Sequence, residues 1–168
     1  MAKLSLPLPG LPEPFLPKLY GALESLPLGR GVASRVYRTA APYFLTVPVR
    51  LDRLEPGRAE ASMRAVPWTR NHLGTVHAIA QCNLAEYVMG ALAEATIPPS
   101  HRWIPRGITA TYNAKATGRL RATATIDLPA ELADKQELPV DVRIRNAQDV
   151  EVATITIPIW VTAKPARA

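Results

Sequence analysis

The sequence predicts an α+β domain in which a six-stranded antiparallel sheet wraps around one long central helix, preceded by two short N-terminal helices. One weakly charged helical run extends from Asn71 to Thr96 and stops at Pro98-Pro99. Segments with alternating apolar and polar residues, two before this run and four after it, predict strands. Short turns join these strands, which favours antiparallel pairing and excludes a sheet built from alternating strands and helices.

The segments ahead of the central helix predict an arm, two helices and a hairpin. Residues 1–14 contain four prolines, which favour an extended Pro-rich arm over a signal peptide. Apolar residues at helical spacing predict one short helix over residues 15–26 and a second over residues 32–41. Alternation with a period of two predicts a strand over residues 43–51 and another over residues 58–66. A short turn joins these two strands into a hairpin.

The segments after the central helix predict the rest of the sheet. Alternating residues indicate strands over residues 107–115, 119–128, 138–146 and 150–161. The central helix is apolar on nearly every side, which is typical of a buried helix. A curved sheet wrapped around it buries both surfaces. Residues 15–163 are therefore expected to form a single domain, followed by a disordered tail over residues 164–168.

Composition limits the classes of function. The 168 residues carry a formal net charge of +6, but lysine and arginine are scattered and do not interleave with aromatic residues, which disfavours nucleic-acid binding. No uncharged apolar run approaches the roughly 20 residues of a membrane span. Cys82 is the one cysteine, so no intrachain disulfide can form, and a cytoplasmic location is expected. The histidine spacing does not match a metal site, so neither a metal nor a separate cofactor is expected.

A polar motif lies at the start of the central helix, in the stretch NHLGTVHAIAQCNLAE. It resembles the signature of hotdog-fold acyl-CoA thioesterases, the phenylacetyl-CoA thioesterase group in particular, at Asn71, Gly74, Thr75, His77, Leu84, Ala85 and Glu86. Pro42-Tyr43-Phe44, the NHLGTVHAIA core and the two leading helices resemble the DUF4442 branch of this superfamily more closely. The resemblance spans roughly residues 15–163 and implies a hotdog fold and the hydrolysis of acyl-CoA thioesters.

Three positions of the motif are candidates for thioester chemistry. A carboxylate in an apolar helix loses solvation and gains basicity, and by resemblance Glu86 acts as general base or nucleophile. Without the motif, a wet or subunit-facing position of Glu86 is favoured. If the helix begins near Thr75, the backbone N–H of Ala78 lacks an intrahelical partner, and by resemblance it stabilises the oxyanion unless Thr75 caps the helix. Asn71 by resemblance orients the thioester carbonyl or the attacking water, and a turn or capping role is the alternative.

The remaining polar residues have open assignments. His77 lies about half a turn around the helix from Glu86, which favours a hydrogen bond to the preceding loop over proton transfer. Asn83 either bonds the Glu86 carboxylate or a substrate carbonyl, or is an amide of a dimer interface. Lys115 and Arg119 flank a Thr-Gly turn, where by resemblance they lie near the phosphates of coenzyme A, with solvated turn residues as the alternative.

The length of the helix predicts a site shared between subunits. Ala78 and Glu86 are eight residues apart, about 12 Å along a helix, so one carbonyl cannot contact both. An antiparallel second copy across a two-fold axis brings Glu86 of one subunit near Ala78 of the other, which is how hotdog thioesterases build their sites. The expected assembly is a homodimer or a dimer of dimers, with coenzyme A present only as part of the substrate.

Two departures from the thioesterase pattern keep other functions open. His77-Ala78-Ile79 replaces the usual His-Gly-Gly, and Gly90 stands where some relatives have Thr or Ser. The bulk of Ile79 favours the alternative of a non-catalytic hotdog module that binds acyl groups or scaffolds a complex. A hydratase or dehydratase of acyl thioesters would need an Asp/His pair after this helix, which is absent. The serine-hydrolase motif Gly-x-Ser-x-Gly is absent as well.

Overall fold

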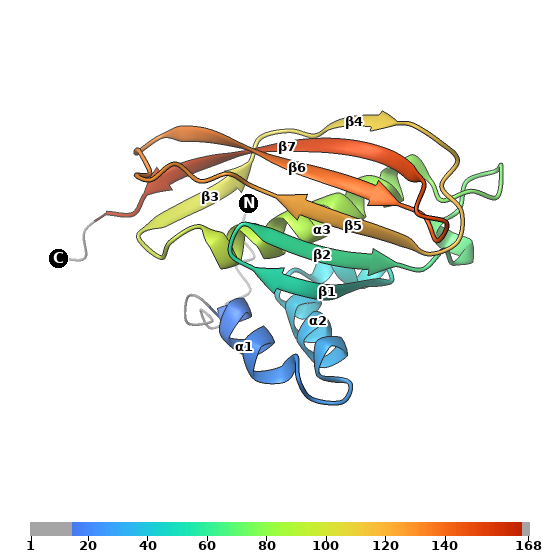
Figure 1. Cartoon of the computed structure of the whole chain (residues 1–168), viewed down its shortest axis with the longest axis horizontal. Coiled ribbons are helices and arrows are strands. Elements are labelled where there is room, and N and C mark those ends of the chain that lie inside the picture. The colour runs from blue at the N-terminus through green and yellow to red at the C-terminus, as the bar shows by residue number, and fades with distance from the viewer. Residues whose placement is uncertain (1–14, 166–168) are drawn as a thin grey trace, which may run out of the picture.

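The structure, a computed structural model, describes residues 15–165 and consists of a curved antiparallel sheet packed against one long helix (Figure 1). The predicted arm over residues 1–14 and the end of the predicted tail lie outside the described residues. The sheet has seven strands in the order β1-β2-β5-β6-β7-β3, and β4 also pairs with β7. The strands are β1 (Val49–Glu55), β2 (Arg58–Met63), β3 (His101–Pro105), β4 (Thr109–Tyr112), β5 (Leu120–Thr125), β6 (Gln136–Arg145) and β7 (Glu151–Ala163).

The central helix α3 (Ala78–Thr96) packs across one face of this sheet and contacts strands from β1 through β7 (Figure 1). Leu84, Val88 and Leu92 are completely buried, as the apolar character of the helix predicts. The helix ends where Pro98-Pro99 prevents its continuation. A seven-stranded sheet curved over one helix is the hotdog architecture that the resemblance implies, with one strand more than expected.

The two predicted N-terminal helices are present as α1 (Phe15–Leu23) and α2 (Gly29–Ala40). They pack together beside β1, the strand at one edge of the sheet (Figure 1). The Tyr20 hydroxyl donates to the carbonyl of Asp52 at 2.7 Å, and the Ser34 hydroxyl accepts the N–H of Leu51 at 2.8 Å. The helices therefore satisfy backbone groups of an edge strand that are otherwise open to pairing with another chain.

One strand prediction is wrong at its start, and one strand was not predicted. The strand expected over residues 43–51 begins only at Val49, because Pro42–Thr46 forms a 3-10 helix, η1. The Arg38 side chain donates to the carbonyls of Phe44 and Leu45, at 2.8 and 3.1 Å, and holds these acceptors away from the sheet. The other error is the unpredicted β3, a short edge strand that starts two residues after the Pro98-Pro99 pair.

Candidate active site

The loop before α3 is fixed by the side chain of Asn71. Its Oδ1 accepts the N–H groups of Leu73 and Thr75, at 3.0 and 3.2 Å, and its Nδ2 lies 2.9 Å from Thr75 Oγ1. Gly74 in the same loop has a φ of +75°, a conformation that favours glycine. The turn-forming alternative for Asn71 is therefore the one that these contacts support, since both ends of its amide are used within the loop.

His77, and not Thr75, caps the central helix. The helix begins at Ala78, three residues later than expected, and the His77 Nδ1 accepts the N–H of Ile79 at 3.1 Å. The His77 N–H donates to the Thr69 carbonyl at 2.8 Å. The prediction that Thr75 begins or caps the helix is wrong because the Thr75 side chain is bonded to Asn71. An acceptor role for Nδ1 places the proton of a neutral His77 ring on Nε2.

The first turn of α3 leaves the N–H of Ala78 free. No acceptor for this N–H is found within residues 15–165, as expected for the first residue of a helix. On the neighbouring β4, the Tyr112 hydroxyl lies 3.3 Å from the Ala78 carbonyl and 3.3 Å from the Cys82 sulfur. Burial and the Cys82 thiol raise the pKa of Tyr112 to about 12, so this hydroxyl stays protonated at neutral pH. The N–H of Ala78 is thus a free donor at the N-terminal end of α3, the end at which the helix dipole favours negative charge.

Glu86 lies two turns further along α3, at an apolar groove of about 430 Å³. The groove runs between α1, α2, η1, α3 and β3, and its walls include Phe15, Leu16, Phe44, Met89 and Trp103. Glu86 is half-buried there, and no hydrogen bond or ion pair joins it to another residue of the described part of the chain. A carboxylate in such surroundings is available to a ligand that occupies the groove.

The other predicted site residues are separated from Glu86. The Asn83 Oδ1 accepts a hydrogen bond from the Tyr43 hydroxyl at 3.1 Å, and no bond from Asn83 to Glu86 is formed in residues 15–165. Lys115 is an exposed loop residue, whereas Arg119 lines a second cavity, on the side of β1 and β2. Within the described residues, no group of three or more His, Cys, Asp or Glu side chains is placed to hold a metal ion.

Tyr37 of α2 is a groove residue that the sequence did not single out. A Cβ built on Gly90 of α3 would lie 2.7 Å from the Tyr37 hydroxyl. Burial, together with the neighbouring Tyr87, Glu94 and Glu86, raises the pKa of Tyr37, so its hydroxyl remains a donor. A glycine inside a buried helix costs about 1 kcal/mol relative to alanine, which was the available signal that another group approaches closely.

Gly90→Ala is expected to destabilise the protein by about 1–3 kcal/mol, because the new methyl group must displace the Tyr37 hydroxyl. The Tyr37 ring packs against Tyr87 at 5.2 Å between centroids, which limits how far it can move. Urea unfolding measures the change. Gly31→Ala in α2 is the matched control, since nothing lies within 4 Å of a Cβ built at Gly31 and no loss of stability is expected there. Equal stability of the Gly90→Ala variant and the wild type would contradict the close approach.

A comparison with protein-family models places this chain in a family. The profile described as "Domain of unknown function (DUF4442)" matches residues 29–161, most of the chain. The chain belongs to the DUF4442 family. The matched region includes α2, α3 and nearly the whole sheet. This member of the DUF4442 family therefore has the hotdog fold. A comparison with curated proteins finds no match.

Several solved structures are similar to this chain. A structural-genomics protein shares 36% sequence identity with this DUF4442 chain, at a TM-score of 0.75. The match covers 89% of the DUF4442 chain and 98% of the structural-genomics protein. A Pseudomonas aeruginosa protein of unknown function, named a probable thioesterase, shares 23% identity over 83% and 97% of the two chains, at a TM-score of 0.70. A Haemophilus influenzae thioesterase shares 16% identity over 72% of this chain and 82% of its own, at a TM-score of 0.63. The last two, at this level of identity, show a common fold.

Within residues 15–165, the structure contains no helix with the length and apolar character needed to cross a membrane.

Proposed function

We propose that this DUF4442 protein hydrolyses acyl thioesters, with acyl-coenzyme A as the substrate class. The observation that carries the proposal is the half-buried Glu86, which forms no hydrogen bond or ion pair within the described chain and lies at an apolar groove. The fold shared with proteins named thioesterases supports the same reaction. The single thiol, Cys82, suits a reducing compartment such as the cytoplasm.

In the proposed reaction, Glu86 acts as general base and takes a proton from a water molecule as its oxygen attacks the thioester carbonyl. A C–O bond forms, and the developing oxyanion accepts a hydrogen bond from the free N–H of Ala78 of the partner subunit. Collapse of this intermediate breaks the C–S bond, and the proton held by Glu86 passes to the departing thiolate. The products are a carboxylic acid and a free thiol, and the reaction as proposed uses only water and the thioester.

The proposal includes a homodimer, because Ala78 and Glu86 lie too far apart along one helix to contact one carbonyl. The exposed side chains near the first turn of α3 favour such an interface: Ile79 is 58% exposed, Ile108 43% and Tyr112 44%. The adjacent strand β4 pairs only with β7, so its other edge is open within the described residues. An open edge beside exposed apolar side chains is the type of surface that pairs with a second chain.

The remaining residues of the proposed site have supporting roles. Asn71 and His77 shape the loop and first turn that present the Ala78 N–H, as their hydrogen bonds indicate. Asn83 is proposed to orient a substrate carbonyl through its amide nitrogen, since its oxygen is bonded to Tyr43. Lys115 and Arg119 carry the positive charge proposed to attract the phosphates of coenzyme A.

A non-catalytic acyl-binding module is the second candidate function. The observation in its favour is Ile79, whose exposed side chain stands next to the Ala78 N–H where thioesterases have glycine. In this alternative the groove beside Glu86 still takes an acyl group, but the thioester does not reach the free N–H.

The test is thiol release from a panel of short, long and phenylacetyl acyl-CoA thioesters. The wild type is expected to cleave at least one of them, and Glu86→Gln to lower kcat at least about 100-fold because the general base is lost. Glu131→Gln removes a carboxylate from an exposed loop and serves as the matched control. Binding without release by the wild type supports the non-catalytic module, and equal rates in the Glu86→Gln variant contradict the role of this residue.

A further inference from the structure

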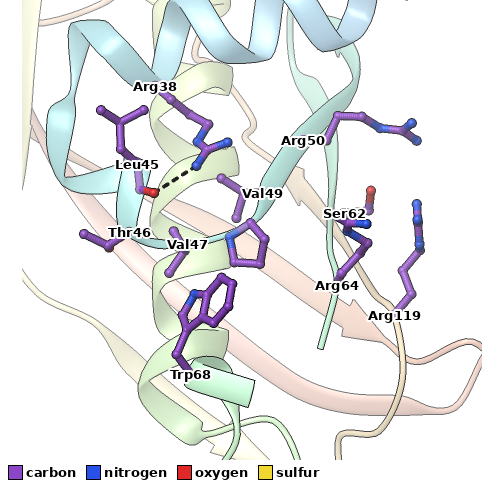
Figure 2. Close-up of a pocket in the computed structure, with 11 residues that line it drawn as sticks. Arg38, Leu45, Thr46, Val47, Val49, Arg50, Ser62, Arg64, Trp68 and Arg119 are labelled. Carbon is purple, nitrogen blue, oxygen red and sulfur yellow. Dashed lines mark hydrogen bonds between the residues drawn. The ribbon is translucent and has the colours of Figure 1, made fainter. Parts of the chain in front are cut away.

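A second cavity, of about 400 Å³, lies beside the start of β1 and is lined by four arginines and a tryptophan (Figure 2). Arg38 comes from α2, Arg50 from β1, Arg64 from the end of β2, and Arg119 from the loop before β5. Figure 2 shows Arg50, Arg64 and Arg119 on one side of the cavity, with Arg38 and Trp68 at two other sides. Four separate segments of the chain therefore bring positive charge to one place.

The residues that line this cavity include no Asp or Glu. Arg64 and Arg119 form no ion pair and no side-chain hydrogen bond within residues 15–165, and Arg50 alone is paired, with Asp52 at 2.6 Å. Like charges gathered in a hollow with little compensation create a positive potential that concentrates anions. The planar guanidinium group forms paired hydrogen bonds with phosphate oxygens, so phosphate is the anion that this set of side chains suits.

Arg38 is already held in place for such a contact. Its Nε donates to the Phe44 carbonyl at 2.8 Å and its Nη2 to the Leu45 carbonyl at 3.1 Å, the latter drawn in Figure 2. These two bonds fix the guanidinium group and leave its other N–H groups for a ligand. A positioned donor loses less conformational entropy on binding than a mobile side chain.

Trp68 adds a flat apolar surface to the charged cavity. This residue is 71% exposed, which is unusual for a tryptophan. The short helix η2 (Pro67–Thr69) that carries it is fixed by Thr69, whose hydroxyl lies 3.0 Å from both the N–H and the carbonyl of Val66. A rigidly mounted, exposed indole beside arginines is suited to stack on the planar base of a nucleotide.

Both walls of the cavity are attached to the first half of α3. In η1, Tyr43 donates to Asn83 of this helix, and Leu45 and Thr46 of the same segment line the cavity. Next to Trp68, the Thr69 carbonyl accepts the N–H of His77, the cap of the helix. A molecule bound in the cavity therefore lies next to the elements that carry the proposed active site.

We propose that this cavity binds a nucleotide, with its phosphates on Arg64, Arg119 and Arg38 and its base on Trp68. The binding itself is independent of catalysis. Its assignment to the nucleotide end of coenzyme A rests on the proposed function. Lys115 lies outside the cavity, so Arg119 contributes to this site without its predicted companion.

The test is isothermal titration of the purified wild-type protein with ADP, coenzyme A and pantetheine. ADP and coenzyme A are expected to bind, and the double variant Arg64→Ala/Arg119→Ala is expected to weaken both at least about tenfold, because two charge-assisted contacts are lost. Arg30→Ala/Arg35→Ala removes the same charge from exposed positions of α2 and is expected to leave the affinity for ADP within about twofold. Trp68→Leu is expected to weaken the binding of ADP more than the binding of inorganic phosphate.

The outcomes distinguish three questions: whether the cavity binds a nucleotide, which nucleotide it binds, and whether the protein hydrolyses thioesters. Absence of binding by both ADP and coenzyme A, or an equal loss in the two double variants, overturns the proposal. Coenzyme A that displaces ADP supports the nucleotide end of the thioester substrate as the ligand, whereas ADP that coenzyme A cannot displace supports a free nucleotide. A protein that binds ADP through these arginines but releases no thiol from any thioester retains this site and loses only the proposed function.

Discussion

Replacing Ala78 by proline is expected to lower kcat for thioester hydrolysis about 10²–10³-fold while α3 stays folded. Ala78 is the first residue of this helix, and its N–H has no acceptor within residues 15–165. Proline is well tolerated at the first helical position, where its missing N–H breaks no helical hydrogen bond. His77 before it has a φ of −60° and a ψ of +143°, which is the extended conformation required ahead of proline. The substitution thus removes one donor and little else.

The measurement is kcat with a thioester that the wild type cleaves, together with the midpoint of thermal unfolding. Ala78→Gly keeps the N–H and is the matched control, with kcat expected to stay near that of the wild type. A large fall in the unfolding midpoint of Ala78→Pro would mean that the loop was disturbed, and Ala78→Gly then still reports on the site: its activity must exceed that of the proline variant. Wild-type kcat in Ala78→Pro contradicts the oxyanion role of this N–H.

The parts of the fold governed by local pattern were predictable from the sequence. Apolar residues on every side of α3 predicted its burial, and period-two alternation predicted the regions of β1, β2, β4, β5, β6 and β7. The errors arose where a contact that the alternation of apolar and polar residues does not encode decides the conformation. Residues 43–46 have the composition of a strand, but Arg38 binds their carbonyls and η1 forms instead. The strand β3 follows two prolines and gains its pairing from the distant β7.

The candidate site was predictable to the extent that it lies on one helix. The spacing of the motif residues predicted that Ala78 and Glu86 lie on the same helix, α3, and the structure places Glu86 at an apolar groove. The length of the loop before the helix was misjudged, because a side-chain bond between Asn71 and Thr75 delays the start of the helix. The sequence did not predict the place of Tyr37 in the groove or the grouping of the arginines around one cavity, since each is assembled from segments that meet only in the folded chain.

Mixed dimers of Glu86→Gln and Ala78→Pro subunits are expected to regain thioesterase activity that neither variant has alone. Each proposed shared site uses Glu86 of one subunit and the Ala78 N–H of the other. A mixed dimer therefore contains one site with both defects and one with none. Random reassortment makes about half of the dimers mixed, each with one of its two sites intact, so the mixture is expected to reach about a quarter of wild-type activity.

The experiment combines the two purified variants after partial unfolding and refolding together, and compares thiol release with that of each variant refolded by itself. The wild type, treated in the same way, gives the activity that refolding restores. If Glu86 and the Ala78 N–H act within one subunit, every site in the mixture keeps one defect and activity stays at the level of the single variants. Recovery therefore requires that the two groups act across the interface, because a free carboxylate and a free N–H about 12 Å apart on one helix complete a site only when the second helix runs antiparallel to the first.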